Sequence, residues 1–236
     1  MSNSLNISMI KDIAMALGEL KDEVVFVGGA VVSLYIDDVA APTPNPSEDI
    51  DCVVEIASYS EWQKLEKVLR EKNFKDMRPG EEAPKNILCR KYYLKTIVDF
   101  MPIEKDILGM TNSWFKEGFQ NKKEIKLPGT DLNIYIFTLP YFLASKIEAY
   151  NGRGLKGDPR ESQDLEDISQ MLDGCTKFEA EFNEGNEKVK LFIRDNFKKW
   201  LEEWDIYSEA IGGFLAYESK EVRIDRIYNI LNKIIS

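Results

Sequence analysis

The chain contains an apolar, strand-like segment that ends at two glycines, VVFVGG (24–29). The apolar run AVVSLYI (30–36) follows the glycines and predicts a helix. Three prolines then interrupt residues 40–48, which can form neither a helix nor a central strand and must be a loop. The next segment, DIDCVVEI (49–56), has the β-branched and apolar residues of a second strand. This order of elements restricts the chain to folds built on a sheet.

The remaining patterns divide the chain into two parts. Helical spacing marks residues 7–20 and 60–72, strand-like segments fill 91–103, and a hairpin is expected over 125–137. From residue 139 onward the periodicity is helical, without strand patterns. We therefore predict an α+β fold, or a related α/β one, with a mixed sheet in a catalytic domain over 1–138 and a mainly helical domain over 139–236.

Composition indicates an ordinary globular protein, since 236 residues that are 44% hydrophobic can fill a core. The longest apolar stretch, 24–36, contains two glycines and is too short to span a bilayer. The amino-terminal residues lack the features of an export signal. Three cysteines, Cys52, Cys89 and Cys175, are odd in number and far apart, which favours neither disulfides nor a zinc site. We expect a cytoplasmic protein with no membrane partner.

The formal net charge of -10 argues against a surface that grips nucleic acid throughout, because phosphate binding needs a basic footprint. The charge is uneven, however, since residues 85–126 contain nine Lys or Arg against five Asp or Glu. A local contact with nucleic acid therefore stays open.

The sequence contains no histidine. Its absence excludes Ser-His-Asp and Cys-His nucleophile systems, HExxH zinc sites and histidine general bases. Acid–base or metal chemistry must then rest on carboxylates, Lys, Tyr or Cys. Hard, oxygen-ligated ions such as Mg²⁺ or Mn²⁺ are the metals to expect.

Carboxylates occur where such an ion would bind. Asp49 and Asp51 are two residues apart on a predicted strand, so their side chains point to the same face. Adjacent carboxylates repel unless a cation neutralises them. Asp99 stands among apolar residues in TIVDFM (96–101), which is hard to explain as a solvated surface group and makes it the candidate third carboxylate, with Asp106 as the nearby alternative.

The paired glycines, Gly28 and Gly29, would expose unpaired N–H groups at a helix start, a place that can cradle a triphosphate. A Cβ at Gly28 is expected to block the approach of phosphate while leaving the metal ligands untouched. The alternatives are that the glycines form a simple tight turn and that the Asp pair is an ordinary solvated surface feature.

Together these motifs resemble the nucleotidyltransferase superfamily that shares the DNA polymerase beta catalytic fold. More narrowly, 25–55 together with VDFMP (98–102) and LPYFLASKIEAY (139–150) is similar to the AbiEii-type, type IV toxin-like nucleotidyltransferases, a resemblance that spans about residues 24–174. The resemblance implies Mg²⁺-dependent (or Mn²⁺-dependent) transfer of a nucleotide from an NTP to a tRNA, protein or small-molecule acceptor, and an antitoxin partner. It implies that Asp49, Asp51 and Asp99 all hold the metal, that Asp99 also activates the acceptor hydroxyl, and that Gly28 and Gly29 form the phosphate turn.

A second family signature is matched by Lys146, Arg153 and Asp164, which the resemblance would place at the nucleotide. Other interpretations stand beside it. Asp164 and Asp167, three residues apart on one helix face, could hold the two cations or be solvated. Asp158 before a proline is also a good helix start and need be no more than a cap.

A catalytically inactive nucleotide- or cation-binding regulatory protein of the same fold is the alternative function.

Overall fold

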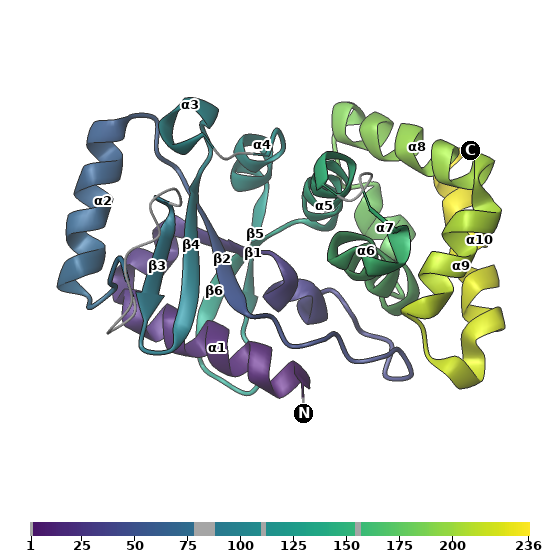
Figure 1. Cartoon of the computed structure of the whole chain (residues 1–236), viewed down its shortest axis with the longest axis horizontal. Coiled ribbons are helices and arrows are strands. Elements are labelled where there is room, and N and C mark those ends of the chain that lie inside the picture. The colour runs from purple at the N-terminus through teal and green to yellow at the C-terminus, as the bar shows by residue number, and fades with distance from the viewer. Residues whose placement is uncertain (1, 78–87, 110–111, 154–156) are drawn as a thin grey trace. The chain divides into compact units, whose positions relative to one another are not determined.

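The computed structural model describes residues 2–77, 88–109, 112–153 and 157–236 (Figure 1). The chain forms two compact units: a sheet unit of Met1–Val31 and Asn45–Phe137, and a helical unit of Val32–Pro44 and Thr138–Ser236. Helices and a mixed sheet occur together, with helices alone toward the carboxyl end, so the expected α+β class is confirmed. Among the described residues, none of the helices is long and apolar enough to cross a lipid bilayer.

The sheet unit is built on six strands in the order β3-β4-β2-β1-β6-β5. β2 runs parallel to β4, β1 runs parallel to β6, and the other neighbouring pairs are antiparallel. The central strand β1 is wholly buried, and the apolar residues of β2 are buried while Asp49 and Asp51 are partly exposed. The strands are β1 (Val24–Val27), β2 (Asp49–Val54), β3 (Arg90–Tyr93), β4 (Thr96–Pro102), β5 (Lys122–Lys126) and β6 (Asn133–Phe137).

The described part of the sheet unit also contains α1 (Ser2–Leu17), η1 (Gly18–Glu23), α2 (Tyr59–Glu71), α3 (Lys105–Leu108) and α4 (Phe115–Gln120). One stripe of α1, including Ile10, Ile13 and Leu17, is fully buried, which explains its helical spacing in the sequence. The Ser58 side chain caps α2 by accepting a hydrogen bond from the Glu61 N–H. Residues 78–87, which hold the start of the basic stretch, lie outside the described part of the chain.

The segment after the glycines differs from the expectation. Instead of an α-helix, residues Gly29–Leu34 form a 3-10 helix, η2, which is only six residues long. Gly28 has φ +77, a left-handed conformation that glycine adopts without strain. Ala30, Val31 and Val32 are buried in this short segment. A short 3-10 segment has few aligned peptide dipoles, so η2 attracts a triphosphate much less than the start of an α-helix would.

The helical unit contains α5 (Leu139–Arg153), η4 (Pro159–Glu161), α6 (Gln163–Gly174), α7 (Phe178–Phe182), α8 (Glu187–Glu202), α9 (Trp204–Gly213), η5 (Tyr217–Ser219) and α10 (Lys220–Ile235). Aromatic rings form part of its core: Trp200 stacks on Tyr207 at 5.2 Å between centroids and meets Tyr150 edge-on at 5.9 Å. The periodic apolar residues of 139–236 are thus explained by helix-on-helix packing.

Residues Val32–Pro44 belong to the helical unit, which the sequence-based boundary at 138/139 did not anticipate. The N–H groups of Asp37 and Asp38 both donate to the Gly174 carbonyl at 3.0 Å. The Asp37 carboxylate accepts from the backbone N–H and the hydroxyl of Thr176, each at 2.7 Å. These bonds attach the segment to the carboxyl end of α6.

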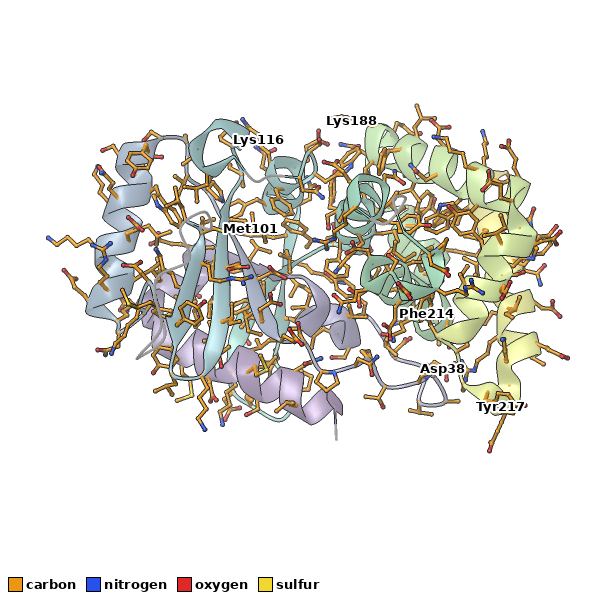
Figure 2. All side chains as sticks on the ribbon, viewed as in Figure 1. Asp38, Met101, Lys116, Lys188, Phe214 and Tyr217 are labelled. Atoms are coloured by element: carbon orange, nitrogen blue, oxygen red, sulfur yellow. The ribbon has the colours of Figure 1, made fainter. Side chains whose placement is uncertain are left out.

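A buried ion pair holds the same segment from α10. Arg223 NH1 lies 2.7 Å from an oxygen of Asp173, whose side chain is fully buried, and Arg223 NH2 donates to the Ala40 carbonyl. Arg226 bonds the Asp38 carboxylate at 3.0 Å. Figure 2 shows Asp38 on this loop, near the last helices of the same unit.

Candidate active site

Three polar residues form a row across neighbouring strands of the sheet. In the parallel pairing of β2 with β4, Asp51 lies opposite Asp99, and in the antiparallel pairing of β3 with β4, Arg90 lies opposite the same Asp99. Asp49 lies two residues before Asp51 and on the same face. The structure therefore brings together the three carboxylates singled out in the sequence and adds an arginine to them.

Arg90 binds the carboxylate of Asp99 with two parallel hydrogen bonds, from Nε to Oδ1 at 2.9 Å and from NH2 to Oδ2 at 2.7 Å. The same NH2 atom lies 3.7 Å from Oδ2 of Asp49. The side chain of Asp99 is only 10% exposed, and that of Arg90 is 25% exposed. A two-pronged pair of this kind fixes both position and orientation of the carboxylate.

Negative charge is crowded around Asp49 and Asp99, and it shifts the pKa of nearby groups. Burial raises the pKa of Asp49, and the charge of Asp99 raises it further, while Arg90 acts in the opposite direction. Burial also raises the pKa of the Cys89 thiol to about 11, with a contribution from Asp99, so this neighbour stays protonated and neutral at pH 7. One guanidinium thus offsets only part of the charge of the carboxylates.

Gly28 packs directly against one of these carboxylates. A Cβ placed on Gly28 would lie 1.9 Å from Oδ2 and 2.8 Å from Cγ of Asp51. The expectation that a side chain here would leave the metal ligands untouched is therefore wrong, because Asp51 occupies the space that a Cβ would take. The glycine is required by the close approach of a carboxylate as well as by its backbone conformation.

The segment leading into β2 is held by a buried asparagine of α1. Asn6, which is fully buried, accepts a hydrogen bond from the Ser47 N–H at 2.8 Å and donates to the Asn45 carbonyl at 3.1 Å. The Ser47 hydroxyl lies 3.4 Å from Oδ1 of Asp49. Asn6 therefore fixes the backbone immediately before the Asp pair. Neither Asn6 nor Arg90 was identified from the sequence, since the partners of Asn6 are about 40 positions away and Arg90 meets Asp99 only through the register of β3 on β4.

Asp49 and Asp51 fit a hard divalent cation, because they offer oxygen ligands side by side in a region of excess negative charge. Asp99 is engaged differently, since both of its oxygens accept from Arg90. Within the described ranges, no group of three or more His, Cys, Asp or Glu is arranged to hold a metal ion. The side chain of Asp106, the alternative third carboxylate, lies outside the described part of the structure.

The residues of the second signature form an ion-pair cluster between α5 and α6. Lys146 lies 2.6 Å from Oδ2 of Asp167 and 3.5 Å from Oδ1 of Asp164. Arg153 binds both oxygens of Asp164, at 2.8 and 2.9 Å. The structure thus shows the carboxylates holding the two cations. Burial is the main cause that raises the pKa of Asp167, and the charge of Lys146 opposes it.

Exposure distinguishes the two cations of this cluster. The Lys146 side chain is 11% exposed, whereas that of Arg153 is 73% exposed and can reach a ligand without unfolding α5. Asp158 caps the short helix η4, where it accepts from the Arg160 N–H and pairs with the Arg160 guanidinium. Capping of η4 is therefore sufficient to explain the presence of Asp158.

Comparison with known proteins gives little more. No protein-family model and no curated protein sequence matches the chain. Among solved structures, it is similar to an antigenic nucleotidyltransferase-like protein from Paracoccidioides brasiliensis, with a TM-score of 0.48 and 17% identity over 90% of this chain and 94% of the other.

Proposed function

We propose that this chain is a metal-dependent nucleotidyltransferase that moves a nucleotide from an NTP to an acceptor. The observation that supports this best is the gathering of Asp49, Asp51 and Asp99 on one face of adjacent parallel strands. Phosphoryl transfer depends on positioning and charge neutralisation more than on covalent help, so it can proceed without histidine. Transfer to an RNA, a protein or a small molecule is compatible with this chemistry.

In the proposed reaction, Asp49 and Asp51 hold Mg²⁺ or Mn²⁺, which supplies positive charge to the triphosphate when bound. The acceptor hydroxyl forms a bond to the α-phosphorus, the bond from that phosphorus to the bridging oxygen breaks, and pyrophosphate leaves. Asp99 takes the proton of the hydroxyl. Its oxygens can do so while bound to Arg90, because a carboxylate offers about four lone-pair positions and Arg90 uses two.

The nucleotide-binding part of the proposal concerns Gly28, Gly29, Lys146, Arg153 and Asp164. Arg153 is the cation best suited to a phosphate, since its guanidinium is largely exposed. We expect Arg153→Met to weaken NTP binding several-fold without loss of fold. Unchanged NTP affinity in that variant would restrict Lys146, Arg153 and Asp164 to a structural role. Membership of the AbiEii-type group, a toxin-like role and an antitoxin partner are further parts of the proposal, supported by the resemblance in sequence.

The decisive experiment incubates the protein with each α-labelled NTP, Mg²⁺ and a cell extract, and then identifies the labelled species. Asp49→Asn and Asp51→Asn should each abolish labelling while leaving the melting temperature unchanged or higher, because each removes one of several clustered like charges. Asp131→Asn is a matched control, since this aspartate is fully exposed in the same unit and pairs with the exposed Lys126. Label retained by both variants would contradict the proposal.

The alternative function is an inactive nucleotide- or cation-binding regulatory protein. It is favoured by one observation, the engagement of Asp99 by Arg90. Asp99→Asn separates the two functions. An enzyme should keep most of its metal-dependent NTP affinity and lose transfer by orders of magnitude, because the third carboxylate acts chiefly in the transition state. A regulatory protein would bind NTP and show no transfer before or after the substitution.

A further inference from the structure

We propose that Arg90 takes the place of a second metal ion, so that the site binds one divalent cation, at Asp49 and Asp51, and uses Asp99 only as a positioned carboxylate. This inference rests on the proposed function. The geometry of the Arg90–Asp99 pair supports it: both oxygens of Asp99 are bound by one guanidinium, and the Asp99 side chain is nearly buried. A metal ion at Asp99 would have to displace a two-pronged charged contact.

The charge of the cluster leads to the same number of ions. Asp49, Asp51 and Asp99 carry three negative charges when ionised. The positive charge of Arg90 reduces the net charge to −2, which one divalent cation neutralises. A second divalent ion would make the cluster positive beside a guanidinium that lies within 3.7 Å of two of the carboxylates. Changing pH cannot remove this competitor, because arginine stays protonated in proteins.

The position of Arg90 is fixed from the opposite face of β3. The next residue, Lys91, points the other way and is bonded to Glu66 of α2 and to Asp76, each at 2.7 Å. A slip of β3 by one residue would exchange the two faces and bury Arg90 among those acids instead. Lys91 therefore fixes the register that places Arg90 on Asp99. This arrangement identifies Arg90 as a positioning residue built into the sheet.

The test counts Mn²⁺ ions bound to the protein alone, by titration followed with electron paramagnetic resonance, without NTP. We expect one ion in the wild type and none in Asp51→Asn. In Arg90→Gln, Asp99 becomes available as a ligand and a positive charge beside Asp49 is removed, so we expect a second ion or a first ion bound at least about tenfold more tightly. Arg160→Gln is the control, because Arg160 is an exposed arginine of the helical unit that pairs with Asp158, and it should behave like the wild type.

Arg90→Gln leaves a nearly buried carboxylate without its cation and can fail to fold. The double variant Arg90→Gln/Asp99→Asn avoids this, since it replaces the ion pair by two neutral amides and keeps the net charge of the cluster. If Asp99 is not a ligand, the double variant should bind one Mn²⁺ with an affinity within about threefold of the wild type, a change far below the 10–100-fold typical of a lost metal-site partner.

Two outcomes would overturn the inference alone: two ions in the wild type, or loss of Mn²⁺ binding in the double variant. Each would place Asp99 among the metal ligands and leave the proposed transferase intact. A wild type that binds no Mn²⁺ would overturn both the inference and the metal basis of the proposed function. Transfer of label, measured separately, distinguishes these cases.

Discussion

Replacing Gly28 by alanine tests the most crowded contact of the candidate site. The alanine would have to adopt a backbone φ near +77, which costs about 1–2 kcal/mol for a residue with a side chain. It would also lie 1.9 Å from Oδ2 and 3.0 Å from Cβ of Asp51, so rotation of the carboxylate alone cannot relieve the collision. Forcing such a contact in packed surroundings typically costs a further ~1–3 kcal/mol. We therefore expect Gly28→Ala to lower the free energy of unfolding by about 2–5 kcal/mol in total.

Gly129→Ala is the matched control for this prediction. Gly129 has nearly the same conformation, φ +72, but a Cβ there would meet nothing within 4 Å. It should therefore cost only the backbone strain of ~1–2 kcal/mol. Urea unfolding followed by circular dichroism measures both changes, and Mn²⁺ titration should show weaker binding only for Gly28→Ala. Equal destabilisation by the two substitutions, with Mn²⁺ affinity unchanged, would refute the proposed contact with Asp51.

Three further predictions concern residues outside the row of carboxylates. Lys91→Met should lower the free energy of unfolding by about 2 kcal/mol in urea melts, less than the ~3–5 kcal/mol of a fully buried pair, because Asp76 is 41% exposed. Arg223→Met should cost the full ~3–5 kcal/mol, since it leaves Asp173 charged and fully buried, and a change below 1 kcal/mol would contradict that expectation. Hydrogen bonds from Thr176 lower the pKa of Asp37, so its contribution to stability is present above the unfolded-state pKa near ~3.9 and is lost as pH falls through the folded-state value. Acid melts of Asp37→Asn should therefore lack part of the wild-type loss of stability below pH ~4.

Alternation along a strand was enough to predict part of the candidate site. Asp49 and Asp51 had to share a face once DIDCVVEI was taken as a strand, and the apolar neighbours of Asp99 indicated a buried strand around it. Their meeting across β2 and β4 was an expectation that depended on strand order. The sequence contains no direct signal for that order.

Arg90 could have been found from the sequence if the turn had been recognised. β3 and β4 pair Tyr93 with Thr96, so a two-residue turn at Leu94 and Lys95 places Arg90 opposite Asp99. Such turns usually contain Asn or Gly, because their residues need positive φ. Leu94 adopts φ 52 without being either. The usual signal was therefore missing, and the register remained open.

The segment after the glycines could not be predicted from local sequence for a different reason. Its apolar residues suit a helix, yet they form a short 3-10 segment that leads into a loop held by the helical unit. The contacts that hold this loop come from α6 and α10, far along the chain. Local propensity is a weak guide where such distant contacts decide the conformation.

The loop that follows the glycine turn cannot form all of its bonds until the last helix of the chain has been synthesised. Ala40 and Arg223, which bond each other, are separated by 183 positions in the chain. Domains tend to fold from the amino terminus as they emerge from the ribosome, so the strands can pair early. The loop between Gly28 and Asp49, however, cannot form its bond to Arg223 until α10 has been synthesised. A nascent chain that ends before α10 would therefore contain the sheet with Asp49 and Asp51, but the loop between them and Gly28 would lack its bond to Arg223.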